Sequence, residues 1–211
     1  MLSGSSSAQR GRKALFAAWL LLLALSGACA QAGEHTDTTT LALDSARSRA
    51  DFEVKVLWLI GVHGRFGKVH GTVTIDHFRS TALADARIDV GSITMRSRRY
   101  EEWVKSDEFF DAQRYPQIRF VSEAIPLERL RNGGSFSGTL TLRGIDKTVT
   151  MQLEPSACPE TIAVACPVAA SGTIRRSDFG MHSRRGTLSD KVELGFSIYL
   201  EGPLTEPGHG P

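Results

Sequence analysis

The stretch FSGTLTLRGIDKTVTMQLEP, residues 136–155, decides the fold class. Every second residue is apolar or small, namely Phe136, Gly138, Leu140 and Leu142 in the first half and Val149, Met151 and Leu153 in the second. Side chains alternate between the two faces of a β-strand, so each half predicts a strand with one apolar and one polar face. Between them, RGIDK supplies Gly144 and Asp146, which turns favour. The stretch therefore predicts a β-hairpin whose apolar face needs cover.

The same alternation recurs before and after this hairpin. It runs from Ala50 to Trp58, again in VHGTVTID, and then in DARIDVGSITM, QIRFVSEAI, VAASGTIRRSDFG and KVELGFSIYLEG. Together these segments make about eight strands with short connections. The pattern predicts an all-β domain, mostly antiparallel, built as a sandwich or a barrel.

One segment, residues 97–116, has a helical pattern instead. Its large apolar residues recur at helical spacing, namely Tyr100, Trp103, Val104, Phe109 and Phe110. Ser97 is a suitable N-cap, and Pro116 stops any helix before the next strand. We expect one or two short helices laid against the sheet.

The first 32 residues resemble a secretory signal peptide. Arg10, Arg12 and Lys13 precede an apolar run over residues 15–25, and small residues with A-x-A spacing follow. The run is shorter than the roughly 20 residues that a membrane-spanning helix needs. Ser26 lies three residues before Cys29, where lipidation signals have an aliphatic residue, so the pattern disfavours a lipid anchor at Cys29. We expect export to the periplasm.

Beyond the leader we expect a flexible lead-in over residues 33–42, one domain over 43–202 and a disordered tail over 203–211. The chain has 25 Lys and Arg residues, of which three lie in the leader, against 23 Asp and Glu residues. The remainder has 22 basic and 23 acidic residues, a balance of −1 with neutral histidines. This balance argues against nucleic-acid binding, which needs a basic excess to neutralise phosphates.

Two cysteines follow the leader, Cys158 and Cys166, in SACPETIAVACPVAA. A pair of cysteines in an exported protein usually forms a disulfide, because that compartment is oxidising. Their spacing, without a nearby histidine or second cysteine pair, does not match a zinc site. We expect a disulfide that staples a loop.

No pattern in the sequence indicates catalysis. The histidines do not form a metal-binding spacing, and there is no G-x-S-x-G nucleophile motif. Asp107, Glu108 and Asp111 could be imagined as an acid–base group, but beside two phenylalanines they fit the polar side of an amphipathic turn. We therefore expect no enzyme activity, no metal and no cofactor other than a bound ligand.

The segment RRSDFGM, residues 175–181, places two arginines at the end of a strand. In one interpretation Arg175 or Arg176 contacts the polar headgroup of a ligand at the mouth of a barrel. In the other, Arg176 pairs with Asp178 or another carboxylate to hold the turn.

Four segments together resemble the YceI-like family of exported polyisoprenoid-binding proteins. They are DFEVKVLWLIGVHGRFGKVHGTVTID, VGSITMRSRRYEEWVKSDEFFDAQRYPQIRFVSEAI, GTLTLRGIDKTVTM and IRRSDFGMHSRRGTLSDKVELGFSIYLEG. The resemblance implies a lipocalin-like antiparallel β-barrel that holds a long isoprenoid chain, such as a quinone or polyprenyl lipid. The family's first strand usually opens with a His-Ser pair, and here Arg47-Ser48 or Arg49-Ala50 stands in its place.

We expect the ligand to lie against the inward residues of the barrel. These are Phe52, Val54, Val56, Trp58, Val73, Ile88, Ile118, Phe120, Phe136, Leu140, Met151, Ile174, Phe179, Phe196 and Ile198. Small inward residues, namely Gly71, Gly138, Ala170 and Gly172, are expected to leave room for it. The favoured function is a periplasmic carrier of an isoprenoid lipid that contacts the membrane transiently. The alternatives are a structural or stress protein acting through protein contacts, including a homodimer, and an enzyme on prenyl or quinone substrates.

Overall fold

The hairpin of residues 136–155 folds as strands β9 (Gly134–Leu142) and β10 (Ile145–Leu153). A two-residue turn joins them, and its residues Arg143 and Gly144 have φ angles of 55° and 70°. Positive φ at both positions is what a type I′ turn requires. Asp146, assigned to the turn from the sequence, instead pairs with Thr141 inside the ladder. The hairpin is confirmed, with a tighter turn than expected.

The computed structural model describes residues 37–156, 158 and 166–201. The predicted signal peptide, Cys29 and the predicted tail lie outside them. The remaining strands are β1 (Thr38–Ala42), β2 (Arg49–Val56), β3 (Ile60–Phe66), β4 (Val69–Asp76), β5 (Thr81–Asp89), β6 (Ile93–Met95), β7 (Gln117–Ser122), β8 (Ile125–Pro126), β11 (Val168–Arg175) and β12 (Leu188–Ile198). The helical elements are α1 (Arg98–Lys105), α2 (Leu127–Asn132) and the 3-10 turns η1 (Val90–Ser92) and η2 (Arg176–Phe179).

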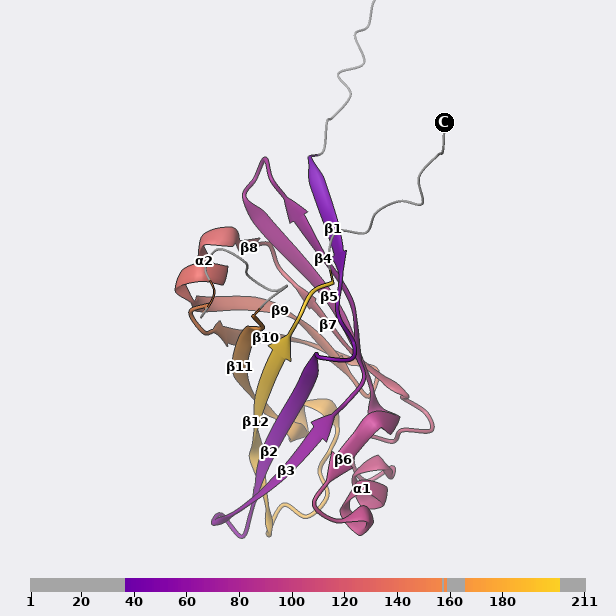
Figure 1. Cartoon of the computed structure of the whole chain (residues 1–211). Coiled ribbons are helices and arrows are strands. Elements are labelled where there is room, and N and C mark those ends of the chain that lie inside the picture. Colours follow the sequence, from indigo (N-terminus) through magenta and orange to yellow (C-terminus); the bar gives the residue numbers. More distant parts are fainter. Residues whose placement is uncertain (1–36, 157, 159–165, 202–211) are drawn as a thin grey trace, which may run out of the picture. The chain divides into compact units, whose positions relative to one another are not determined.

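All described strands belong to one antiparallel sheet with the order β1-β4-β5-β7-β9-β10-β11-β12-β2-β3-β6, and β8 pairs with β5. Strands β1, β4 and β5 lie at one end of this order, and β2, β3 and β6 lie at the other. Three stretches of chain, β1–β2, β3–β4 and β5–β6, therefore each have one strand at each end. The sheet accordingly curls around a common interior (Figure 1). A bridge between Leu43 and Leu200 links the start and the end of the domain.

The predicted barrel of about eight strands is therefore confirmed. Three bent stretches and the five unbroken strands β7, β9, β10, β11 and β12 account for that number. The prediction of a flexible lead-in over residues 33–42 was wrong in part, because Thr38–Ala42 forms β1 and pairs with β4. Where β4 bends, Gly71 has a φ of 142°, and a Cβ there would lie 2.0 Å from the carbonyl oxygen of Asp85. Only glycine permits this close approach of two strands.

Helix α1 begins directly after Ser97, as predicted, and lies near the β2–β3 hairpin in the lower half of Figure 1. Ser97 makes no side-chain capping bond. Helix α2 was not predicted. It fully buries no side chain, and its two leucines, three residues apart, are too short a pattern to predict a helix.

The predicted disulfide between Cys158 and Cys166 is present, with Cα atoms 5.8 Å apart. Cys158 follows shortly after β10, and Cys166 precedes β11. The bond joins the two ends of the connection between these strands, as expected for a loop staple.

Candidate binding cavity

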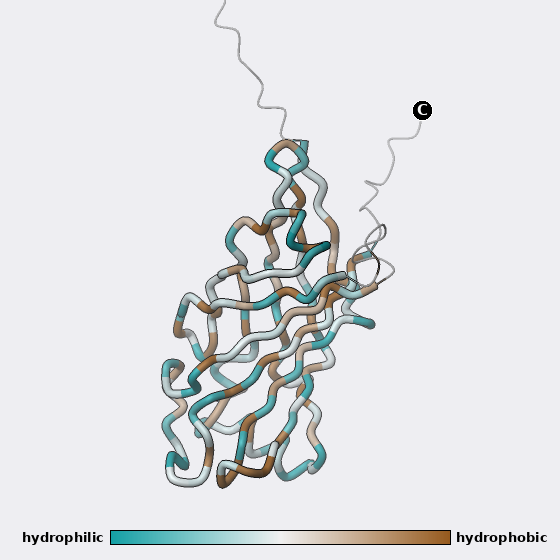
Figure 2. Tube along the Cα trace, turned by 90° about the vertical axis from the view of Figure 1, so that its left-hand side faces the viewer, coloured by the Kyte–Doolittle hydropathy of each residue, from teal (hydrophilic) through white to brown (hydrophobic). Residues whose placement is uncertain are grey.

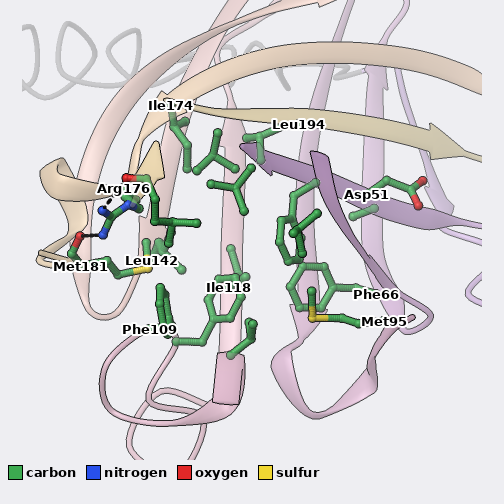
Figure 3. Close-up of a pocket in the computed structure, with 18 of the residues that line it drawn as sticks. Asp51, Phe66, Met95, Phe109, Ile118, Leu142, Ile174, Arg176, Met181 and Leu194 are labelled. Carbon is green, nitrogen blue, oxygen red and sulfur yellow. Dashed lines mark hydrogen bonds between the residues drawn. The ribbon is translucent and has the colours of Figure 1, made fainter. Parts of the chain in front are cut away.

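The barrel interior contains a cavity of about 360 Å³, here called the main cavity. Its wall comes from strands on several sides of the barrel and from the segment that includes α1. Figure 3 shows the side chains of Phe66, Ile118 and Leu142 converging on this space. Most of its lining is aliphatic or aromatic, and the charged exceptions are Asp51, Arg176 and Arg184. Such a surface favours an apolar guest.

A second cavity of about 120 Å³ lies next to the first and is lined only by apolar side chains. Ile88 and Phe196 belong to the walls of both cavities. The two spaces are therefore neighbours along the barrel, and these two side chains form the partition between them. A long apolar chain that displaced the partition would reach from one cavity into the other.

Thirteen of the inward residues expected from the sequence line one or both cavities. In the main cavity these are Phe52, Val54, Val56, Ile88, Ile118, Leu140, Ile174 and Phe196. The second cavity contains Val73, Ile88, Phe120, Phe136, Met151, Phe196 and Ile198.

Two of the expected inward residues lie elsewhere. The expectation that Trp58 points inward was wrong, because β2 ends at Val56 and Trp58 is 65% exposed in the following turn. Phe179 lies in η2 and is buried among the core residues, with 1% exposure, but it lines neither cavity.

The sequence prediction missed the aromatic part of the wall near α1. Trp103, Phe109 and Phe110 line the main cavity, although they were expected only to cover the sheet from outside. Phe110 lies 5.9 Å from Phe52 and 5.6 Å from Phe66 between ring centroids, both edge-on. Their helical spacing was the available signal, but it does not say which residues reach the interior.

The expected role of the small inward residues was mostly wrong. A Cβ on Gly138 would lie 2.4 Å from the Phe120 ring, and one on Gly172 would lie 2.4 Å from the Met151 sulfur. Large neighbouring side chains already occupy these spaces. At Ala170, by contrast, the side chain does line the second cavity.

Arg176 supplies a buried cation at the edge of the main cavity, with only 2% exposure. Its Nε, Nη1 and Nη2 atoms donate to the carbonyl oxygens of Ser189, Met181 and Leu188 at 2.9, 2.6 and 3.2 Å. The prediction of a carboxylate partner was wrong, because backbone oxygens hold the side chain (Figure 3). Burial lowers the pKa of this guanidinium, and the nearby charge of Asp190 opposes that shift. Arg175 is exposed and lines neither cavity.

Asp190 joins η2 to β12 through Ser177. Its carboxylate accepts from the Ser177 amide at 3.0 Å and from the Ser177 hydroxyl at 2.7 Å. Burial alone raises the pKa of Asp190, but these two hydrogen bonds and the charges of Arg176 and Arg175 outweigh it. The net result is a lowered pKa, so the carboxylate is ionised near neutral pH.

One carboxylate near α1, that of Glu108, has structural partners. Glu108 accepts from the Trp103 indole nitrogen at 2.9 Å and lies 3.6 Å from Arg184, whose guanidinium stacks 4.7 Å above the Trp103 ring. Within residues 37–156, 158 and 166–201, no three His, Cys, Asp or Glu side chains are grouped to hold a metal ion. None of the described helices has the length and apolar character needed to cross a membrane.

An antiparallel barrel around an apolar cavity defines a binding fold for apolar molecules. Comparison with known proteins shows the family: a family model described as YceI-like domain matches residues 41–200. The chain belongs to the YceI-like family.

Several relatives share most of their length with this chain. A UPF0312 protein of Staphylococcus aureus strain MSSA476 is 27% identical over 168 residues, covering 77% of this chain and 94% of that protein. The crystal structure of Burkholderia cenocepacia BcnA is 27% identical, with a TM-score of 0.61 over 74% of this chain and 98% of the other. A polyisoprenoid binding domain from Saccharophagus degradans shares the fold, with 16% identity and a TM-score of 0.58 over 78% and 99% of the two chains.

Proposed function

We propose that this protein binds a long-chain isoprenoid lipid, a quinone or a polyprenyl compound, in the barrel interior and carries it through the periplasm. The observation that carries the proposal is the main cavity of about 360 Å³ with its largely apolar wall. Each buried methylene group contributes roughly 0.8 kcal/mol, so an apolar tail needs few polar contacts to bind tightly. A barrel packed solid, as the protein-contact alternative requires, would have no such space.

The distribution of polar groups indicates how the ligand lies. The carboxylate of Asp51 at the main cavity is already paired with Arg65 at 2.6 Å. The other polar groups there include Arg176, Arg184 and Thr187, whereas the second cavity has none. We therefore place the headgroup beside these three residues and the tail toward the partition. Arg176 uses three of its five N–H donors on backbone oxygens, which leaves two for a headgroup oxygen.

The choice of ligand class rests on the family. Membership of the YceI-like family and the shared fold of the Saccharophagus degradans polyisoprenoid binding domain both favour an isoprenoid over other apolar guests. The periplasmic location rests on the leader in residues 1–32.

The test is native mass spectrometry of the protein purified from the envelope of a producing bacterium, with organic extraction of anything bound. A prenyl lipid in one-to-one ratio supports the proposal and identifies the cargo. A protein that is empty, and that takes up neither ubiquinone nor the polyprenol solanesol from cyclodextrin, overturns it.

A further inference from the structure

The tip of the β2–β3 hairpin exposes four consecutive large apolar side chains, here called the apolar tip (residues 57–60). The exposed fractions of Leu57, Trp58, Leu59 and Ile60 are 54, 65, 88 and 59%. Figure 2 shows an apolar loop at the lower end of the barrel, where Figure 1 places this hairpin. A contiguous exposed apolar patch marks an interaction site more often than a scattered apolar residue does.

The backbone of the apolar tip is unfavourable for its own side chains. Leu57 and Trp58 have φ angles of 49° and 65°, a region where glycine and asparagine are preferred. Large apolar residues there are strained and, in this case, also exposed to solvent. Strain that persists without any gain in burial points to a selected function outside the fold.

The apolar tip lies beside the main cavity. The Leu57 amide donates to the carbonyl oxygen of Thr187 at 2.7 Å, and Val56 pairs with Leu188 across the β2–β12 ladder. Val56, Thr187 and Leu188 all line the main cavity. A surface that received the apolar tip would therefore lie next to the polar end of the cavity, where the headgroup is placed above.

Cationic side chains flank the apolar tip. Lys55 lies two residues before it and is exposed, and the loop that receives the Leu57 amide carries exposed Arg184 and Arg185. Arg184 has an acidic neighbour, Glu108 at 3.6 Å, and the charge of Lys55 contributes to the lowered pKa of Glu193. Arg185 is hydrogen-bonded to the His182 ring at 2.7 Å. Apolar residues bordered by Lys and Arg match the surface of a bilayer with anionic headgroups.

We infer that the apolar tip docks the protein on an anionic membrane surface by inserting its side chains among the lipid headgroups and upper acyl chains. Tryptophan favours this interfacial depth. Backbone groups also resist leaving water, but the amides of Leu57 and Leu59 already donate to Thr187 and Val56. A second copy of the chain is a poorer occupant, because four side chains fall far short of the roughly 800 Å² per partner in a stable interface.

The inference that the protein docks on membranes does not depend on the proposed function. The further inference that docking serves to load and unload lipid does rest on the proposed function. In that use, the polar end of the main cavity faces the bilayer while the apolar tip is inserted. A tail could then leave the membrane without crossing open water.

The test is sedimentation of the purified protein with vesicles of phosphatidylcholine, with and without phosphatidylglycerol. The double variant Trp58→Ser/Leu59→Ser should bind the mixed vesicles at least about tenfold more weakly than the natural protein. Phe78→Ser is the matched control, because Phe78 is as exposed as Leu59, at 88%, but lies in the β4–β5 turn at the other end of Figure 1. It should bind as the natural protein does.

The charged flank has its own variant, Lys55→Glu/Arg185→Glu, which should weaken binding to the mixed vesicles and leave binding to pure phosphatidylcholine unchanged. Brominated lipids should quench Trp58 fluorescence, and Trp58→Phe should remove that quenching while it still sediments. If the natural protein binds neither kind of vesicle, the docking proposal is overturned. So does a Trp58→Ser/Leu59→Ser variant that binds as tightly as Phe78→Ser.

Failure of docking and failure of the proposed function give different results. Solanesol delivered from cyclodextrin reaches the cavity without a membrane, so Trp58→Ser/Leu59→Ser should load normally by native mass spectrometry. Normal loading without vesicle binding by the natural protein refutes docking alone. Vesicle binding without loading refutes the carrier function and leaves docking intact.

Discussion

Filling the main cavity from one side should block the ligand without unfolding the barrel. Ile174 lies on β11, is buried and lines the main cavity (Figure 3). In Ile174→Trp an indole ring would project into this space. The matched control is Leu83→Trp, which adds the same ring at a half-exposed position on β5 that lines neither cavity.

The size of the effect follows from the volume exchanged. Tryptophan brings about six more side-chain heavy atoms than isoleucine, roughly the size of one five-carbon isoprene unit. At roughly 0.8 kcal/mol per buried carbon, excluding one unit weakens binding by about 4 kcal/mol, or about a thousandfold in Kd. A tail that shifts toward the second cavity recovers part of this, so we expect a loss of at least about tenfold. Overpacking should reduce the free energy of unfolding by no more than about 1–3 kcal/mol.

The assay is uptake of solanesol from cyclodextrin, followed by native mass spectrometry, with urea unfolding of each variant as the folding control. Ile174→Trp should remain folded and lose uptake, whereas Leu83→Trp should keep both. If folded Ile174→Trp takes up solanesol as the natural protein does, the main cavity is not the ligand site, and our assignment of the wall residues is refuted.

Three further predictions concern stability, each measured by urea unfolding. Phe179→Ala should lower the free energy of unfolding by about 3–5 kcal/mol, because a fully buried ring is lost, and a loss below about 1 kcal/mol would contradict its place in the core. Gly71→Ala should lower it by at least about 2 kcal/mol, because the new Cβ meets the Asp85 carbonyl oxygen at a strained φ; unchanged stability would show that β4 can shift. Because the pKa of Asp190 is lowered in the fold, its stabilisation is complete above about pH 4 and is lost as the pH falls through its folded value. Asp190→Asn should therefore show a shallower loss of stability in acid, and a slope equal to that of the natural protein would exclude this contribution.

Alternation of apolar residues predicted most of the cavity wall because a barrel strand keeps one face inward over its whole length. It failed at Trp58 because periodicity does not show where a strand ends. The turn after Val56 has the sequence Leu57-Trp58-Leu59, without the glycine or asparagine that usually marks a hairpin. The same residues that misled the prediction form the apolar tip.

The other errors concern neighbours that are distant in the sequence. Whether Gly138 leaves a void depends on Phe120, which occupies that space from another strand. The partners of Arg176 are backbone oxygens, and every residue has one, so the sequence contains no signal for them. Identity and spacing predict which face a residue takes, but contacts between strands decide what fills the space above it.

The pairing of β2 has a consequence for the order in which the chain can fold. Strand β2 forms one ladder with its neighbour β3 and the other with β12, the last strand of the described residues, about 140 residues later. A chain made from its N-terminus has β2 early, but the partner on its open side arrives last. Until then the unpaired backbone N–H and C=O groups on that edge of β2 are available to other chains, and the cavity has no closed wall. The protein therefore needs protection until β12 is available for folding, and loss of β12 alone should leave a chain that aggregates rather than a smaller barrel.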